Sequence, residues 1–196
     1  INQTDKKIIT IEDPVEYQMD GINQIHVNPQ IGLTFAGGLR HIVRQDPDVI
    51  MVGEIRDRET ADIAIRAALT GHFVYSTLHT NDAPTAVTRL LDLGLPPYLL
   101  QSTVLGVMAQ RLVRTLCPHC KEAGDLDDET WNRLVTPWKA NKPAQVYYAK
   151  GCLECRMTGY MGRVGLYEML TMSPALRRLV TQETDLQSLT DQAYKD

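Results

Sequence analysis

Short apolar runs and helical patterns alternate through the first half of the chain. Three runs are strand-like and lie at residues 7–11, 48–52 and 72–78. The second of them is continuously apolar, as expected for a strand that is buried on both faces of a sheet. Apolar residues recur at the spacing of an amphipathic helix at residues 33–44, 58–70 and 82–93. Strands that alternate with helices predict an α/β fold with a mainly parallel, doubly wound sheet.

The remaining segments have a different pattern. Residues 15–28 are expected to form an extended excursion or a hairpin through Gly21. Residues 95–116 are predicted to be helical, and residues 162–170 to form a strand pair that leads into a helical tail. We therefore expect three parts: an α/β domain at residues 1–112, a small subdomain held by a metal at 113–158, and a C-terminal strand and helical segment at 159–196.

The composition excludes several classes of protein. Of the 196 residues, 43% are hydrophobic and 22% are charged, which excludes wholesale disorder. The longest uncharged run, residues 93–110, is interrupted by two prolines and several polar residues, so it is too broken to span a membrane. No secretory signal or transit peptide is visible. Because the chain opens on Ile1 and enters a strand almost at once, we expect it to be a piece of a longer protein.

Four cysteines form two C-x-x-C pairs, Cys117 with Cys120 and Cys152 with Cys155. Each pair can supply two thiolates from one tight turn, and two pairs complete a tetrahedral Zn²⁺ site. Four thiolates leave no open coordination position, so we expect a structural role. The alternatives are disulfides, a redox dithiol, unpaired buried thiols, or His119 in place of one cysteine ligand.

Polar residues follow each of the three strand-like runs, at the place where ligands bind in open parallel sheets. Glu12 follows the first run, Glu54 the second, and Ser76, Thr77 and His79 close the third. If the strands are neighbours, their ends form one crevice with carboxylates, hydroxyls, an imidazole and an arginine, Arg56. Such acids suit Mg²⁺, and one carboxylate can orient an attacking water. The alternative is that the acids are helix caps or solvated turns and that the histidine is structural.

Four segments carry a resemblance to a known family, the type II/type IV secretion and pilus assembly ATPases. Residues 9–17, ITIEDPVEY, resemble the Asp box of that family, and residues 39–57, LRHIVRQDPDVIMVGEIRD, resemble its Walker B segment with the preceding arginines. Residues 70–82, TGHFVYSTLHTND, resemble its His box. Residues 109–120, AQRLVRTLCPHC, continue the likeness into a tetracysteine element. The resemblance implies a RecA-like P-loop NTPase fold, followed by the zinc subdomain and a helical C-terminal part.

The resemblance also implies roles for individual residues. Glu12 would polarise the attacking water with support from Asp13 and Glu16, and Glu54 would hold Mg²⁺, mostly through water. Which of Glu12 and Glu54 activates the water stays open. Two histidines would stabilise the γ-phosphate region, namely His72 and His79. Three arginines would contact phosphates or the site of a neighbouring subunit, namely Arg40, Arg44 and Arg56. Taken without the resemblance, Arg40 and Arg44 are one helical turn apart and fit a solvated helix face.

One departure from the family pattern concerns the phosphate-binding loop. A Walker A loop has the pattern G-x-x-x-x-G-K-[ST], and this sequence contains no Gly-Lys dipeptide. We expect the missing loop to lie just before residue 1 in the longer protein. The chain would then hold the hydrolytic half of a site that uses ATP with Mg²⁺, and the isolated chain is expected to be inactive.

The resemblance implies a hexameric motor that couples ATP hydrolysis to type II secretion pseudopilus assembly and protein export. It implies a peripheral location on the cytoplasmic face of the bacterial inner membrane. The implied partners are an inner-membrane platform protein and a cytoplasmic recruiting protein, without nucleic acid. The segment at residues 105–120 is more similar to the secretion branch than to the pilus branch.

Three alternatives stay open: a type IV pilus extension ATPase, a non-catalytic zinc-stapled interaction module, and a nucleic-acid-dependent RecA-like translocase. The net charge of −4 and the acidic segment at residues 121–129 count against the translocase, because both disfavour phosphate binding.

Overall fold

The computed structural model describes residues 2–136 and 140–196. The chain divides into two compact units, a first unit of residues 1–109 with 168–196 and a second unit of residues 110–167. The division into three domains, expected at residues 1–112, 113–158 and 159–196, stays a prediction. Within the described ranges, no helix is both long enough and apolar enough to cross a membrane.

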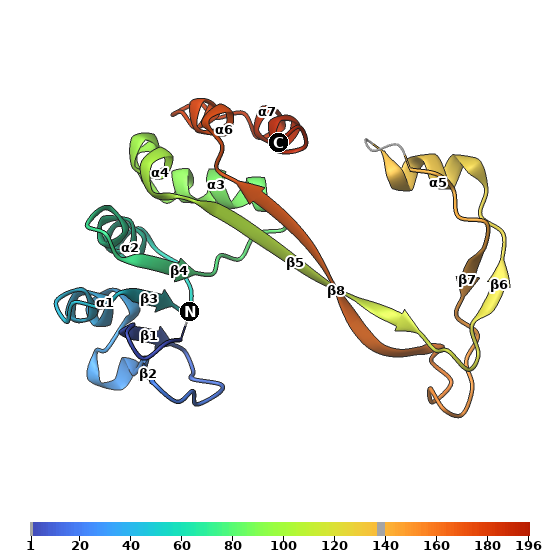
Figure 1. Ribbon diagram of the computed structural model, residues 1–196, viewed down its shortest axis with the longest axis horizontal. Coiled ribbons are helices and arrows are strands. Elements are labelled where there is room, and N and C mark those ends of the chain that lie inside the picture. The colour runs from blue at the N-terminus through green and yellow to red at the C-terminus, as the bar shows by residue number, and fades with distance from the viewer. Residues whose placement is uncertain (1, 137–139) are drawn as a thin grey trace. The chain divides into compact units, whose positions relative to one another are not determined.

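A four-stranded parallel sheet lies in the first unit (Figure 1), with the strand order β2-β1-β3-β4. The strands are β1 (Ile8–Glu12), β2 (Ile22–His26), β3 (Val49–Val52) and β4 (Phe73–Ser76). Strands β1, β3 and β4 confirm the three strand-like runs. Strand β2 is parallel to β1, with Ile22 opposite Ile8. The alternative of a hairpin is therefore wrong, because residues 13–21 carry the chain back to the other end of the sheet before β2 begins.

Two helices cover one face of this sheet, α1 (Phe35–Val43) and α2 (Arg58–Leu69). The packed side chains are Ile9, Ile11, Ile50 and Val52 of the sheet, Phe35, Leu39 and Ile42 of α1, and Ala64 and Ala67 of α2. A short 3₁₀ helix, Pro29–Ile31, precedes α1. Helix α1 approaches β1 closely at Gly38, where an added Cβ would overlap the Cδ1 atom of Ile11. Glycine at this position lets the helix lie directly on the strand.

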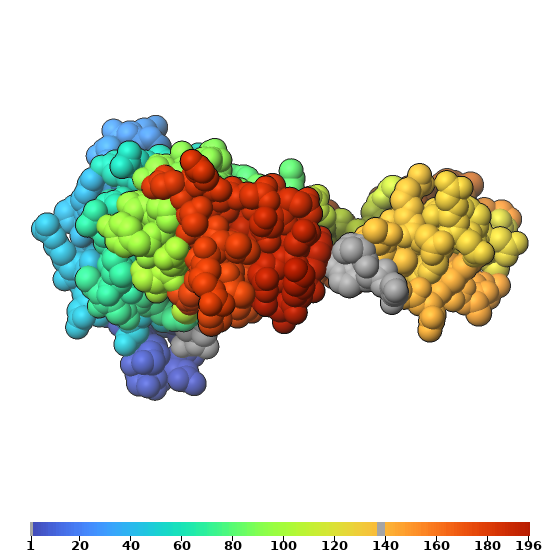
Figure 2. Space-filling model, turned by 90° about the horizontal axis from the view of Figure 1, so that it is seen from above, coloured from blue at the N-terminus to red at the C-terminus, as the bar shows by residue number. Residues whose placement is uncertain are grey.

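A second apolar cluster joins the remaining helices of the first unit. These helices are α3 (Ala83–Asp92), α4 (Pro97–Thr103), α6 (Pro174–Leu179) and α7 (Leu186–Ala193). Leu90, Leu100, Leu176 and Leu189 each contribute a buried side chain to the cluster. Figure 2 shows α6 and α7, in orange and red, lying against the yellow-green α4 segment. The predicted helical tail is thus confirmed, and it packs onto the α/β part.

The prediction of a helix over residues 95–116 is wrong beyond α4. Helix α4 ends at Thr103, and strand β5 (Gly106–Leu116) follows and pairs with β8 (Tyr160–Thr171). The strand pair predicted at residues 162–170 is this single strand, whose partner lies far earlier in the chain. A continuous apolar run fits a buried helix and a strand equally well, so a distant pairing partner decided between them.

The second unit contains very little apolar core. It holds parts of β5 and β8, the antiparallel pair of β6 (Glu122–Gly124) and β7 (Val146–Tyr148), and α5 (Asp128–Val135). Within residues 110–136 and 140–167, the buried hydrophobic side chains are those of Cys117 and Cys155. The centre of this unit is therefore its cysteine cluster.

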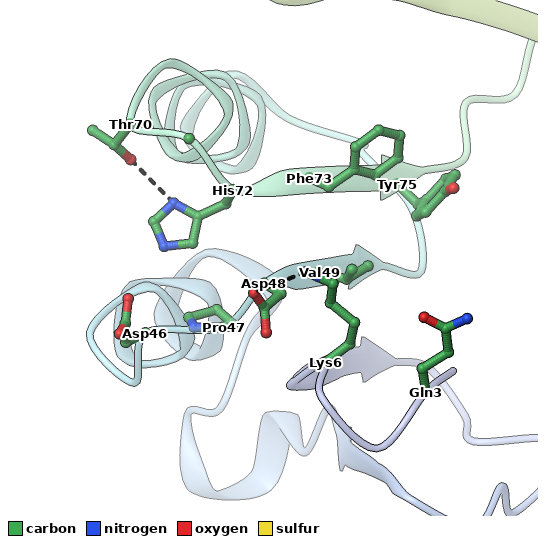
Figure 3. Close-up of a pocket in the computed structure, with 11 residues that line it drawn as sticks. Gln3, Lys6, Asp46, Pro47, Asp48, Val49, Thr70, His72, Phe73 and Tyr75 are labelled. Atoms are coloured by element: carbon green, nitrogen blue, oxygen red, sulfur yellow. Dashed lines mark hydrogen bonds and ion pairs between the residues drawn. The ribbon is translucent and has the colours of Figure 1, made fainter. Parts of the chain in front are cut away.

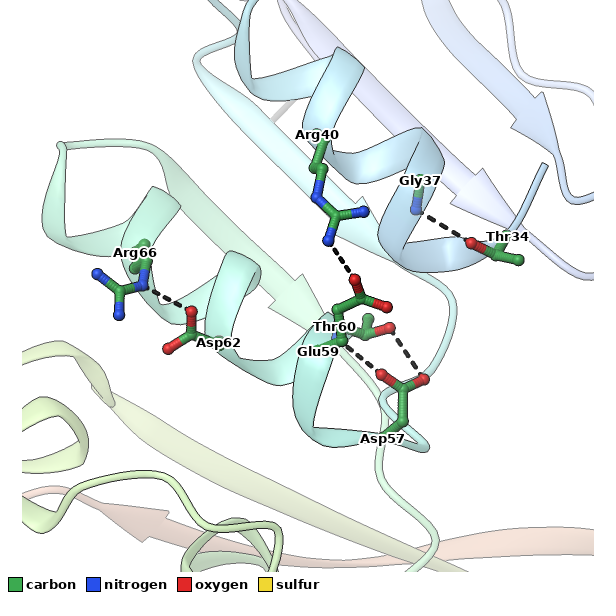
Figure 4. Close-up of polar contacts among 8 residues, drawn as sticks. All are labelled: Thr34, Gly37, Arg40, Asp57, Glu59, Thr60, Asp62 and Arg66. Carbon is green, nitrogen blue, oxygen red and sulfur yellow. Dashed lines mark hydrogen bonds and ion pairs between the residues drawn. The ribbon is translucent and has the colours of Figure 1, made fainter. Parts of the chain in front are cut away.

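Helix α2 begins at a side-chain cap, which Figure 4 draws together with nearby ion pairs. The Asp57 carboxylate accepts hydrogen bonds from the backbone N–H of Thr60, at 2.8 Å, and from the Thr60 hydroxyl, at 3.1 Å. A cap of this kind satisfies one of the N–H groups that the first helical turn leaves without a partner.

Replacing Asp57 with alanine is expected to destabilise the first unit by about 1 kcal/mol, because the cap is lost. The melting temperature should fall by about 2–4 °C, measured by circular dichroism. Asp62→Ala is the matched control on the same helix. It removes only an exposed ion pair with Arg66, which is worth about 0.3 kcal/mol. Equal losses in the two variants would contradict the capping role.

Candidate active site and metal centre

Three strand ends meet at the carboxyl edge of the parallel sheet. The backbone N–H of Gly53, just after β3, donates to the carbonyl of Ile11 in β1 at 2.8 Å. The Thr77 hydroxyl, just after β4, donates to the Gly53 carbonyl at 2.6 Å. An added Cβ at Gly53 would lie 3.2 Å from the Ile11 carbonyl oxygen and 3.3 Å from the Glu12 Cα, so glycine allows this close approach. Glu12, Glu54 and His79 therefore share one edge, as the pattern of the strand ends predicts.

Glu54 is the centre of an ion-pair network at this edge. Its side chain is 12% exposed, Arg56 Nη2 lies 2.5 Å from its Oε1, and His79 Nε2 lies 3.1 Å from its Oε2. The hydrogen bond from Arg56 lowers the pKa of Glu54, burial opposes this shift, and His79 adds to the lowering. Glu54 is thus held as a carboxylate with both of its oxygens engaged.

The acids that follow Glu12 differ in their surroundings. The Asp13 charge is close enough to add to the raised pKa of Arg56, which comes mainly from the hydrogen bond to Glu54. Asp13 therefore belongs to the same electrostatic cluster. Glu16 is exposed on the segment between β1 and β2, and no hydrogen bond or ion pair joins it to the described residues.

The Glu12 carboxylate is oriented by neutral donors. Its Oε1 accepts a hydrogen bond from the Thr10 hydroxyl at 2.5 Å and from the Gln24 side-chain amide at 3.1 Å. Neither Thr10 nor Gln24 is among the site residues predicted from the sequence. The alternation of a strand places Thr10 on the face of Glu12, but Gln24 is a neighbour only through the parallel register of β1 and β2.

His72 lies at the opposite edge of the sheet from His79. It directly precedes β4, whereas His79 comes after that strand has ended. Figure 3 shows the His72 ring beside Thr70, in a cavity of about 610 Å³ that Lys6, Asp48, Phe73 and Tyr75 also line. The His72 Nδ1 lies 2.9 Å from the Ala67 carbonyl oxygen and 3.1 Å from the Thr70 hydroxyl. The structure thus separates two histidines that the sequence predicts for one site, and the role of His72 stays a prediction.

The two arginines of the α1 segment also lie apart from the Glu54 network. Arg40 forms an ion pair with Glu59 in the first turn of α2 (Figure 4). Arg44 is exposed at the C-terminal cap of α1. Arg56 is therefore the member of the predicted arginine set that the structure brings to Glu54.

A polar cavity of about 610 Å³ adjoins the Glu54 network. Arg56 and His79 line it together with Thr85, Thr88 and Arg89 of helix α3. These α3 residues are not among the site residues predicted from the sequence. Along the chain they are ordinary polar positions of an amphipathic helix, and only the packing of α3 brings them beside His79.

The four predicted metal ligands converge in the second unit. The sulfur atoms of Cys117, Cys120, Cys152 and Cys155 all lie within 4.8 Å of one another, and Cys117 and Cys155 are buried. None of these thiols is in a disulfide. Four sulfurs at this spacing form a donor set that could hold one metal ion.

Backbone N–H groups point at the sulfur atoms of this cluster. Gly151 donates to Cys120 at 3.3 Å, and Cys152 and Gly159 donate to Cys155 at 3.2 and 3.1 Å. Burial raises the pKa of the Cys120 thiol to about 12. Burial also acts to raise the pKa of Cys155. The backbone donors, together with the neighbouring thiols of Cys152 and Cys120, outweigh burial and lower that pKa to about 6. The backbone therefore stabilises negative charge at Cys155, as a metal-binding thiolate requires.

Comparisons with known proteins find similar secretion and pilus proteins. The type IV pilus assembly ATPase TfpB of Acinetobacter baylyi is 53% identical over 188 residues, which are 96% of this chain and 32% of that protein. The type II secretion system ATPase E of Vibrio cholerae is 53% identical over 189 residues, which are 96% of this chain and 37% of that protein. The chain thus spans about a third of the length of these relatives.

Among solved structures, the pilus retraction motor PilT with bound ADP matches with a TM-score of 0.67 and 32% identity, over 100% of this chain and 47% of PilT. The ATPase DotB of Legionella pneumophila matches with a TM-score of 0.63 and 26% identity, over 100% of this chain and 45% of DotB. The predicted RecA-like α/β fold with a tetracysteine element is thereby confirmed. The sequence profile of one family covers all of residues 1–196, and the chain belongs to that family, described as "Type II/IV secretion system protein".

Proposed function

We propose that this chain supplies the hydrolytic half of an ATPase site in a full-length motor protein. The observation that carries the proposal is the meeting of Glu12, Glu54 and His79 at one carboxyl edge, beside the cavity that Arg56 lines. Ligands of open α/β sheets bind at this edge. The names of the two relatives, both ATPases, support the same activity.

The donor set at this edge fits Mg²⁺, because carboxylate oxygens and water are the ligands that this ion prefers. When bound, Mg²⁺ neutralises charge on the phosphates of ATP. In our proposal Glu54 holds the ion mostly through water. Arg56 and His79, which contact the Glu54 oxygens, are proposed to contact phosphate oxygens of the nucleotide.

Glu12 is proposed to activate the attacking water. The water oxygen bonds to the γ-phosphorus, the bond from that phosphorus to the β–γ bridging oxygen breaks, and Glu12 accepts the water proton. The products are ADP and inorganic phosphate. Asp13 and Glu16 are proposed to support Glu12 from the segment that follows β1.

A phosphate cradle must come from outside this sequence, because residues 1–196 contain no Gly-Lys dipeptide. We propose that a Walker A loop in the full-length protein provides it. The chain of residues 1–196 by itself is then expected to hydrolyse no ATP.

The cysteine cluster is proposed to hold one structural Zn²⁺. Four sulfurs within 4.8 Å of one another match a tetrahedral site, and four thiolates leave no position open for chemistry. The lack of other buried hydrophobic side chains in described residues 110–136 and 140–167 supports a structural role for the ion.

The motor is proposed to be a hexamer at the cytoplasmic face of the inner membrane, where it drives type II secretion pseudopilus assembly through a membrane platform protein and a recruiting partner. Arg40 and Arg44 lie away from the Glu54 network, so we propose them as contacts to phosphates or to the site of a neighbouring subunit. His72 is proposed to stabilise the γ-phosphate region of nucleotide held by a neighbouring subunit. A type IV pilus extension ATPase is the second candidate, because the pilus and secretion relatives are both 53% identical to this chain.

Replacing Glu54 with glutamine in the full-length protein is expected to lower ATP turnover about 10- to 100-fold, as when a residue that holds a metal through water is changed. The half-saturating Mg²⁺ concentration should rise. Phosphate release is the measurement, and Glu183→Gln, an exposed change on the segment between α6 and α7, is the control. Unchanged turnover in Glu54→Gln would refute the proposed role of Glu54. A wild-type full-length protein without ATP turnover would exclude the motor and favour a zinc-stapled interaction module.

A further inference from the structure

The side chain of Gln24 links three parts of the first unit. Its amide nitrogen donates to Glu12 Oε1 at 3.1 Å and to the Tyr17 carbonyl at 2.9 Å. Its amide oxygen accepts a hydrogen bond from the backbone N–H of Met19 at 2.8 Å. One side chain on β2 therefore holds both the end of β1 and the segment between the two strands.

The two backbone partners determine which way the amide points. A carbonyl can only accept a hydrogen bond and a backbone N–H can only donate one, so the NH₂ group must face Tyr17 and the oxygen must face Met19. The second N–H of the amide then points at Glu12. Because both ends of the amide are engaged by backbone, Gln24 cannot rotate to offer its oxygen to the carboxylate without losing two hydrogen bonds.

The contact leaves the two oxygens of Glu12 in different states. Oε1 accepts from Gln24 and from Thr10, whereas Oε2 makes no hydrogen bond or ion pair with the described residues. Both donors are neutral. The Glu12 carboxylate is therefore oriented without a cationic partner, whereas Glu54 is paired with Arg56. An oriented carboxylate with one free oxygen is the arrangement that a water-activating base needs.

We propose that Gln24 is a positioning residue for ATP hydrolysis, which presents Oε2 of Glu12 to the attacking water. It acts through Glu12 and does not touch the nucleotide. The same amide couples the order of residues 17–19 to the direction of the carboxylate. This inference rests on the proposed function, in which Glu12 is the base.

Replacing Gln24 with methionine in the full-length protein tests the proposal, because methionine keeps the size of the side chain and removes its hydrogen bonds. We expect kcat for ATP hydrolysis to fall about 10- to 100-fold, since a small misplacement of a catalytic group is enough for such a loss. The KM for ATP should change less than about threefold. Gln30→Met is the matched control, because Gln30 is an exposed glutamine on the 3₁₀ helix, outside residues 17–19.

A double-mutant cycle with Glu12→Gln separates positioning from general stability. If Gln24 acts through Glu12, then Gln24→Met should add no further loss of single-turnover rate in the Glu12→Gln background. Equal losses in both backgrounds, or a change in KM alone, would overturn the proposal. If Gln24→Met does not fold, Thr10→Val is the second variant, because it removes the other donor to Oε1 without touching residues 17–19. An unchanged kcat in Thr10→Val would then overturn the positioning of Glu12 through Oε1. A normal rate in Glu12→Gln would instead refute the proposed base, and this outcome is distinct from a normal rate in Gln24→Met alone.

Discussion

Replacing Cys155 with serine is expected to unfold the second unit. A structural Zn²⁺ of this type contributes roughly 10 kcal/mol of apparent folding free energy, and serine is a poor substitute for a thiolate ligand. The unit has little else to stabilise it, because Cys117 and Cys155 are its buried hydrophobic side chains within described residues 110–136 and 140–167. The zinc content, measured by elemental analysis, should fall from close to one zinc per chain to almost none. The unfolding transition of this unit should disappear from the calorimetric trace.

Leu153→Ser is the matched control for the cysteine variant. Leu153 lies between Cys152 and Cys155 and is 88% exposed, so serine there should leave both the zinc content and the transition unchanged. Chelation of the wild-type protein should reproduce the Cys155→Ser result, and added Zn²⁺ should reverse it. Wild-type protein that melts normally while containing no metal would rule out the structural zinc.

Glu12→Gln in the full-length protein is expected to lower kcat for ATP hydrolysis by about 10²- to 10⁴-fold. Glutamine keeps the size of the side chain and can still accept from Thr10, but it cannot accept the proton of the attacking water. Binding of ADP should be nearly unchanged, because Glu12 Oε1 is occupied by Thr10 and Gln24 and the residue is not proposed to contact phosphate.

The Mg²⁺ dependence distinguishes the two glutamates. Glu54→Gln should raise the Mg²⁺ concentration needed for half-maximal turnover, whereas Glu12→Gln should lower the maximal rate at every Mg²⁺ concentration. The reverse pattern would mean that Glu54 is the base and Glu12 the Mg²⁺ partner. This comparison resolves the question that the sequence leaves open.

The candidate site could be predicted from the sequence only in part. The positions of Glu12 and Glu54 follow from where an apolar strand ends, and parallel neighbours bring such ends to one edge. The place of His72 could not be predicted in this way. A histidine at the start of a short strand and one beyond its end are close in sequence, but the strand carries them to opposite edges of the sheet.

The sequence by itself determined the elements whose signal is local. The spacing of apolar residues defined α1, α2 and α3 and strands β1, β3 and β4, and the two C-x-x-C pairs predicted a single four-thiol cluster. Only the tertiary structure decided the elements whose signal is distant. Residues 106–116 form strand β5, and not a helix, because they pair with β8. Gln24 contacts Glu12 because β2 lies parallel to β1 in this register. The physical reason is that helix periodicity and metal-knuckle spacing lie within a few residues, whereas strand pairing depends on a partner that local sequence does not identify.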